Sequence, residues 1–243
     1  MSESPPIKDT SRREFLQKSS AAVVGGSLVA TLGAARTVHA AGSDILKVGL
    51  IGCGGRGSGA AVNAMRADDN MQIVALADAF GDRLDHCKKI LQRQYPDKYA
   101  VNDEHSFVGF DAYKQLLETD VDVVLLCTPP HFRPAQLRAA IEAGKHVFCE
   151  KPVAVDPTGV RSVLETVELA GKKNLSIVSG LCWRYDYGVR ATMERIKEGT
   201  IGDIVSIQEN YLANTLWHRG RKDSWSEMEY QMRNWLYFAW LSG

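Results

Sequence analysis

The chain has 243 residues, of which 45% are hydrophobic and 24% are charged, a composition typical of a globular protein that can bury a core. Its 29 lysines and arginines balance 29 aspartates and glutamates, so the formal net charge is zero. This balance, together with the absence of any run of basic residues interleaved with aromatics, argues against nucleic acid as a partner. The length allows one large domain or two modest ones.

The first 43 residues have the features of an export signal. Arg12 and Arg13 form a twin arginine in a polar segment, and a mildly apolar, Gly- and Ala-rich stretch follows over Ala21–Leu32. That stretch is too short and too weakly apolar to span a bilayer core of about 30 Å, so no stable membrane anchor is expected. Ala40 precedes a suitable cleavage site. The segment resembles a bacterial Tat signal, which implies the Tat export machinery as a partner and a periplasmic location.

The five cysteines are widely spaced and mostly lie in apolar, strand-like runs. Their number is odd, and no two of them have the spacing of metal ligands. We therefore expect buried free thiols in a protein that folds in the cytosol before export, and we expect no metal site.

From residue 46 onward, apolar runs typical of strands alternate with segments typical of helices. Near-continuous apolar strands separated by helices predict a parallel sheet covered on both faces, so the fold class is α/β. The expected strands are Leu46–Ile51, Gln72–Ala77, Val121–Cys127, His146–Cys149 and Leu175–Ser179, with a further short strand within Ala100–Phe110. The expected helices are Gly57–Arg66, Asp82–Tyr95, Asp111–Glu118 with Asp111 as N-cap, Arg133–Ala143 and Pro157–Lys173.

The pattern changes near Gly180, where we place a domain boundary. Arg190–Glu198 is expected to be a helix, and the alternation over Ile204–Leu212 predicts a half-solvated antiparallel strand. The expected parts are therefore a signal and linker (1–43), an α/β domain (44–180), and the start of an α+β domain with a largely antiparallel sheet (181–243).

The first expected strand leads directly into a glycine-rich turn, Gly52-Cys53-Gly54-Gly55-Arg56-Gly57. A strand, a G-x-G-x-x-G turn and a helix start, in that order, form the phosphate cradle of a dinucleotide-binding βαβ unit. Gly52 allows the sharp turn, Gly54 allows backbone to approach a pyrophosphate, and Gly57 allows the helix to pack closely on the sheet. N–H groups at the helix start would then bind the phosphates. Taken alone, the motif fits an ordinary tight turn equally well.

Asp78 ends the second expected strand, 21 positions after Gly57. A carboxylate about 20 residues beyond the glycines is what recognition of a ribose 2′-hydroxyl requires. It would accept hydrogen bonds from the ribose hydroxyls and repel a 2′-phosphate, which favours NAD over NADP. The alternative role for Asp78 is that of a helix cap.

Two further strand ends carry polar residues at the edge where open parallel sheets bind their ligands. One strand ends in Cys127-Thr128-Pro129-Pro130-His131, and the next ends in Glu150-Lys151-Pro152. A lysine can move a proton to or from a substrate hydroxyl when burial lowers its pKa. The alternatives are that His131 is an exposed loop histidine and that Lys151 is a solvated surface lysine.

In this order and at these strand ends, the GCGGRG, CTPPH and EKP motifs resemble the Gfo/Idh/MocA family of NAD(P)-dependent oxidoreductases, over roughly Leu46–Leu212. The resemblance implies a Rossmann-type doubly wound domain and hydride transfer between a sugar or polyol hydroxyl and a nicotinamide cofactor. It implies Lys151 as the catalytic lysine and Glu150 on the nicotinamide side; Trp183 and Arg184 match a family position near the cofactor or form a structural turn. The expected cofactor site is Gly52, Gly54, Gly55, Arg56, Gly57, Asp78, Thr128, Pro129, His131, Glu150, Lys151, Trp183 and Arg184.

The family also has a later Asp/His pair that positions the substrate, and this sequence has no matching pair before Gly243. We therefore expect the sequence to be a fragment of a longer protein that forms a homo-oligomer and takes a small carbohydrate substrate. Two other functions stay open. The first is a glycoside hydrolase in which bound NAD is recycled, and the second is a non-catalytic nucleotide-binding module.

Overall fold

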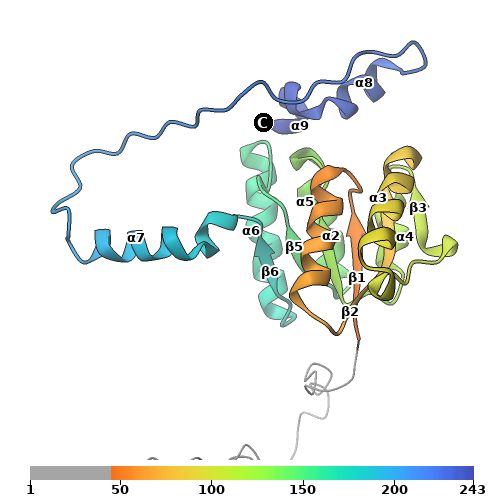
Figure 1. The fold of residues 1–243 in the computed structure, drawn as a ribbon, viewed down its shortest axis with the longest axis horizontal. Coiled ribbons are helices and arrows are strands. Elements are labelled where there is room, and N and C mark those ends of the chain that lie inside the picture. The colour runs from red at the N-terminus through yellow and green to blue at the C-terminus, as the bar shows by residue number, and fades with distance from the viewer. Residues whose placement is uncertain (1–44) are drawn as a thin grey trace, which may run out of the picture. The chain divides into compact units, whose positions relative to one another are not determined.

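A computed structural model describes residues 45–243, so the signal expected at residues 1–43 lies outside the described residues. The strands are β1 (Leu46–Ile51), β2 (Met71–Asp78), β3 (Ser106–Val108), β4 (Val123–Leu126), β5 (His146–Cys149) and β6 (Ile177–Ser179). They form one parallel sheet in the order β3-β2-β1-β4-β5-β6 (Figure 1). The chain builds one half of the sheet outward from β1 and then the other half from β4, which confirms the predicted doubly wound α/β fold.

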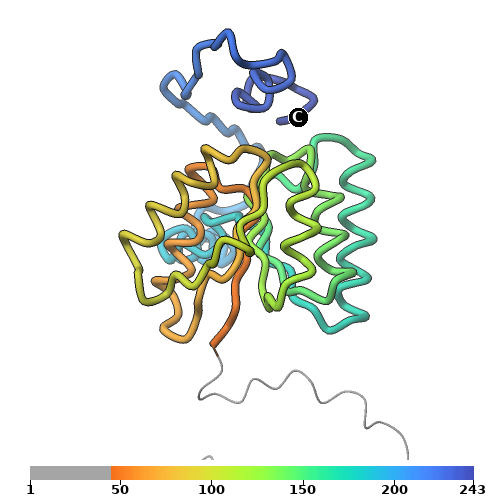
Figure 2. The backbone as a smooth tube through the Cα atoms, turned by 90° about the vertical axis from the view of Figure 1, so that its right-hand side faces the viewer, coloured from red at the N-terminus to blue at the C-terminus, as the bar shows by residue number. Residues whose placement is uncertain are grey.

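Helices cover both faces of this sheet. They are α2 (Gly55–Ala67), α3 (Gly81–Gln94), α4 (Ala112–Leu117), α5 (Arg133–Glu142) and α6 (Pro157–Lys172). Neighbouring strand residues point to opposite faces, so Leu50 packs in the core under α2 and α3, whereas Ile51 packs in the core under α4, α5 and α6. Figure 2 shows helices on both sides of the sheet. Within residues 45–243, no helix is long and apolar enough to cross a bilayer.

The observed element bounds differ from the predicted ones by a few residues. α2 begins at Gly55 rather than at Gly57, because the glycine turn itself forms the first helical turn. Asp111 occupies the N-cap position of α4 as expected. Its side chain, however, makes no capping hydrogen bond and instead pairs with Lys114 at 2.7 Å.

The antiparallel strand predicted at Ile204–Leu212 does not form in this structure, and Val205 is 94% exposed. A strand needs a neighbouring strand to satisfy its backbone N–H and C=O groups. Within residues 45–243, no strand lies beside this segment. The helix expected at Arg190–Glu198 is present as α7 (Tyr187–Lys197), with none of its residues buried.

The C-terminal residues pack against the carboxyl end of the sheet through α8 (Glu227–Arg233) and α9 (Ala239–Ser242). Arg233 of α8 donates two hydrogen bonds of 2.9 Å to Asp82 at the start of α3. Leu241 of α9 is fully buried. A segment that is distant in sequence is thus held beside the turns that follow the strands (Figure 1).

Candidate functional site

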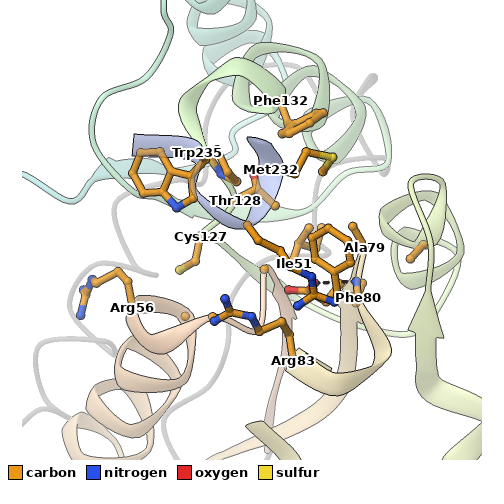
Figure 3. A pocket seen from close by; sticks show the side chains of 18 of the residues that line it. Ile51, Arg56, Ala79, Phe80, Arg83, Cys127, Thr128, Phe132, Met232 and Trp235 are labelled. Carbon is orange, nitrogen blue, oxygen red and sulfur yellow. Dashed lines mark hydrogen bonds between the residues drawn. The ribbon is translucent and has the colours of Figure 1, made fainter. Parts of the chain in front are cut away.

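A cavity of about 330 Å³ lies at the carboxyl end of the sheet (Figure 3). One side of it is formed by the turns that follow β1, β2 and β4, which flank the point where the strand order reverses. The other side is formed by residues 217–235. Open α/β sheets bind their ligands at this point, so the cavity is the candidate functional site.

The glycine turn after β1 leaves space on the cavity side and none on the protein side. Gly52 has a φ of +97°, and a Cβ there would lie 2.7 Å from the Cys127 carbonyl carbon. A Cβ on Gly57 would collide with the Gly52 carbonyl oxygen. A Cβ on Gly54 or Gly55 would meet nothing within 4 Å. The turn is therefore closely fitted to the sheet and open toward the cavity.

Backbone N–H groups at the start of α2 are free to bind an anion. The first bond of the helix runs from the Ser58 N–H to the Gly54 carbonyl oxygen at 2.9 Å. The N–H groups before Ser58 consequently have no partner within the helix, and the helix dipole adds partial positive charge there. This arrangement, together with the open space at Gly54 and Gly55, fits a pyrophosphate group.

Asp78 braces the glycine turn from the end of β2. One carboxylate oxygen accepts the Cys53 N–H at 2.6 Å, and the other accepts the Phe80 N–H at 2.8 Å. Burial raises the pKa of Asp78, although these two hydrogen bonds act in the opposite direction. The N-cap of α3 is Phe80, so Asp78 does not occupy the cap position considered above. Each oxygen keeps one further acceptor site for a ligand hydroxyl.

An ion pair joins the glycine turn to the turn after β5. Arg56 Nε donates to a carboxylate oxygen of Glu150 at 2.5 Å, and Glu150 is buried. The second carboxylate oxygen accepts the Lys151 N–H at 3.2 Å. A Cβ at Gly180 would lie 3.0 Å from this carboxyl group. Glu150 is therefore enclosed by protein groups and does not line the cavity.

A buried arginine joins the turns that follow β4 and β5. Arg133, the first residue of α5, is only 2% exposed and donates to the carbonyl oxygens of Thr128 and Pro152. Burial lowers the pKa of its guanidinium group. The Thr128 hydroxyl donates to Gln136 of the same helix at 2.6 Å. The first turns of α5 thus position both loops that carry predicted site residues.

The structure brings part of the predicted site together. Lys151 is exposed, so its side chain does not meet the expected condition of burial. His131 is also exposed and packs edge-on against Phe132 and Trp240, with ring centroids 5.0 and 5.2 Å away. Neither lines the cavity, and the same holds for Glu150, Trp183 and Arg184. The predicted residues that do line it are Gly52, Gly54, Gly55, Arg56, Gly57, Asp78, Thr128 and Pro129.

Sequence reasoning missed the rest of the cavity wall. Residues of the turn after β2 follow a strand end, so the rule that located Asp78 could have identified them as well. The wall at residues 217–235 had no such signal, because that stretch shows no regular hydrophobic period. The missed residues include Phe80, Arg83, Tyr113, Phe132, Trp217, Arg219, Met232, Arg233 and Trp235.

Comparisons with known proteins agree with this geometry. The model of the GFO_IDH_MocA oxidoreductase family, described by its NAD-binding Rossmann fold, matches residues 46–178, more than half of the chain. A glycosyl hydrolase family 109 protein from Phocaeicola vulgatus is 28% identical over 204 residues, covering 79% of this chain and 36% of the relative. Inositol 2-dehydrogenase from Paracoccus denitrificans is 29% identical over 176 residues, covering 69% of this chain and 48% of the relative.

A solved structure shares the fold. It is a variant of KijD10, a 3-ketoreductase from Actinomadura kijaniata, in complex with TDP-benzene and NADP. The two chains superpose with a TM-score of 0.52 at 25% identity, over 66% of this chain and 46% of the other. The chain spans less than half the length of the curated relatives compared above.

Proposed function

Since the chain belongs to the Gfo/Idh/MocA oxidoreductase family, we propose that it is an NAD-dependent enzyme that transfers hydride between a sugar or polyol hydroxyl and the cofactor. The observation that carries this proposal is the glycine turn, which is open toward the cavity and braced by Asp78 at the sheet edge where such folds bind nucleotides. The similarity to inositol 2-dehydrogenase supports a polyol or sugar as the substrate.

The residues around the cavity fit a dinucleotide. The N–H groups of Gly55, Arg56 and Gly57 would hold the pyrophosphate, and the Asp78 carboxylate would accept hydrogen bonds from the ribose hydroxyls. Thr128 and Pro129 line the cavity after β4, on the other side of β1 from Asp78. When bound, a nicotinamide dinucleotide supplies the ring carbon that accepts or donates the hydride.

We propose NAD rather than NADP because the Asp78 carboxylate would repel a 2′-phosphate. Replacing Asp78 with alanine should weaken NAD binding and reduce the difference in affinity between NAD and NADP. Titration of the chain with each dinucleotide, followed by calorimetry, measures both effects. Asp85→Ala is the matched control, because Asp85 is an exposed aspartate in the following helix α3 and lies outside the cavity. An unchanged preference in Asp78→Ala would remove the argument for NAD.

Lys151 is the residue we propose to move the hydroxyl proton. Nζ, acting as a free amine, would take the proton of the substrate hydroxyl as the C–H bond breaks and the hydride passes to the cofactor. Its backbone is held by Glu150 and, through Pro152, by Arg133. Lys151→Met should abolish turnover of a responsive sugar or polyol by the full-length protein while leaving NAD affinity nearly unchanged. If turnover survives, Lys151 does not have this role.

A second candidate function is glycoside hydrolysis with recycling of bound NAD, and the similarity to a glycosyl hydrolase family 109 protein favours it. The two reactions differ in their cofactor balance. A dehydrogenase releases NADH in step with product, whereas a recycling hydrolase forms product with no net change in NADH. Absorbance at the NADH band during turnover of free and glycosidically linked sugars separates them. Tight NAD binding without turnover of either class would instead indicate a non-catalytic nucleotide-binding module.

We also propose export through the Tat pathway to the periplasm, from the sequence of residues 1–43. Replacing both Arg12 and Arg13 with lysine should keep the protein in the cytosol, which cell fractionation detects. Export that is unaffected by this double replacement would contradict the proposal.

The full-length protein is proposed to form a homo-oligomer, which light scattering after size-exclusion chromatography tests.

A further inference from the structure

The charges that line the cavity are unbalanced. Its charged lining consists of four arginines and one carboxylate, that of Asp78. Two of the arginines have carboxylate partners. Arg56 pairs with Glu150 at 2.5 Å, and Arg233 pairs with Asp82 at 2.9 Å. The other two are Arg83 and Arg219, and within residues 45–243 neither has a carboxylate within ion-pair distance.

These two arginines line the same cavity. Arg83 is half-buried at the start of α3, and Figure 3 shows its side chain reaching into the cavity. Burial and then repulsion from Arg219 lower the pKa of Arg83, while Asp78 and Asp82 act in the opposite direction. Asp78 carries a single negative charge, so it neutralises two guanidinium groups only in part. Two guanidinium groups at the surface of one cavity favour the binding of an anion there.

A buried asparagine fixes the position of Arg219. The Asn234 side chain is fully buried, accepts the Arg219 N–H at 2.8 Å and donates to the Arg219 carbonyl oxygen at 3.2 Å. Its amide also donates to the Tyr230 carbonyl oxygen at 3.1 Å. The Arg219 guanidinium lies over the Trp217 ring, 5.3 Å from its centroid. The arginine is therefore presented to the cavity by a hydrogen-bonded frame.

The same frame is fastened to the α/β unit beside the turn that follows β2. Arg233, the neighbour of Asn234, binds Asp82 through both terminal nitrogens and stacks over the Phe80 ring at 4.1 Å. Phe80 and Asp82 lie two and four positions after Asp78, the carboxylate assigned to the ribose. Arg219 is thus held on the ribose side of the cavity.

We propose that Arg83 and Arg219 form an anion subsite that takes a phosphate group of the adenosine half of the dinucleotide. The inference rests on the proposed function, because it assumes that the cavity binds a dinucleotide. Two phosphate sources share this chemistry, namely the pyrophosphate and a 2′-phosphate, and the proposed preference for NAD requires the pyrophosphate. In either case, residues 217–235 supply a cofactor contact in addition to those of the glycine turn.

The test compares three probes that differ only in their phosphates: adenosine, ADP and 2′,5′-ADP. Calorimetry on the chain gives each affinity for the wild type, Arg219→Gln and Arg83→Gln. Arg221→Gln is the matched control, because Arg221 lies on the same segment, pairs with Glu227 at 2.5 Å and does not line the cavity. We expect Arg219→Gln and Arg83→Gln each to weaken a phosphate-bearing probe about ten-fold, the usual effect of losing one charge-assisted hydrogen bond. Adenosine binding and the control should stay within two-fold of the wild type.

The pattern of losses identifies the phosphate. Weakening of both ADP and 2′,5′-ADP supports a contact with the 5′-phosphate that the two probes share, and weakening of ADP alone supports a contact with the second phosphate of the pyrophosphate. Weakening of 2′,5′-ADP alone supports a 2′-phosphate contact and contradicts the preference for NAD. Equal weakening of all three probes, adenosine included, would show a structural role for Arg219 and overturn the inference. Unchanged affinities would overturn it as well. If the wild type binds none of the three probes, the proposed function fails before the inference is reached.

Discussion

Gly57→Ala is expected to destabilise the folded chain, whereas Gly55→Ala is not. A Cβ on Gly57 would overlap the Gly52 carbonyl oxygen, and a backbone carbonyl between β1 and α2 cannot rotate away as a side chain can. Overpacking of this kind costs about 3 kcal/mol. Alanine recovers about 1 kcal/mol of helix propensity over glycine. The net loss is about 2 kcal/mol, which for a chain of this size lowers Tm by roughly 4–8 °C.

Gly55→Ala provides the matched control. Gly55 is the first residue of α2, is exposed, and has no atom within 4 Å of the position its Cβ would take. The same gain in helix propensity should therefore appear without the collision, raising Tm by up to about 4 °C. Thermal unfolding followed by circular dichroism measures both variants. Equal Tm values for the two variants would refute the claim that Gly57 is required for close packing.

Three further predictions concern titrating groups. Asp82→Asn should release residues 225–243 from α3, which faster proteolysis of that segment would show. Arg233 lowers the pKa of Asp82, so the wild type should lose the same contact as pH falls through that lowered pKa. Asp82 is largely exposed, so the pair should contribute about 1 kcal/mol. An unchanged proteolysis pattern would contradict the assigned contact. Burial raises the pKa of Asp78 above its unfolded value, so the folded state binds the extra proton. The free energy of unfolding should therefore fall, through Asp78, as pH rises from about 3.9 through the raised pKa. Denaturant unfolding at several pH values should show this fall in the wild type and not in Asp78→Asn. Burial raises the pKa of Cys127 to about 12, so iodoacetamide at pH 8 should label exposed Cys182 and spare Cys127, as mass spectrometry would show.

The α/β unit could be predicted from the sequence because its determinants are local. Apolar strands such as β1 carry side chains for two cores, and each turn between strand and helix has its own glycine, proline or aspartate signal. The phosphate end of the site follows from the same local signals, since Gly52 and Gly57 have no room for a side chain.

The remainder of the site depends on contacts between residues far apart in sequence. The pair Asp82–Arg233 joins residues 151 positions apart, and no periodicity records such a contact. Asn234 is a polar residue whose complete burial is explained only by the Arg219 backbone that it binds. The strand expected at Ile204–Leu212 was wrong for a related reason, because alternation shows that a segment can pair but does not supply the partner.

The arginines around the cavity divide into two groups by their partners. Those paired with carboxylates hold parts of the protein together: Arg56 joins the glycine turn to the turn after β5, and Arg233 joins α8 to α3. Arg83 and Arg219, which have no carboxylate at ion-pair distance among residues 45–243, add positive charge at the cavity surface and no such link. Like charges placed together cost free energy in the absence of a ligand. An anionic ligand that relieves this repulsion therefore binds more tightly than its own contacts alone would provide, which is why the unpaired arginines, rather than the paired ones, should govern affinity for phosphate-bearing probes.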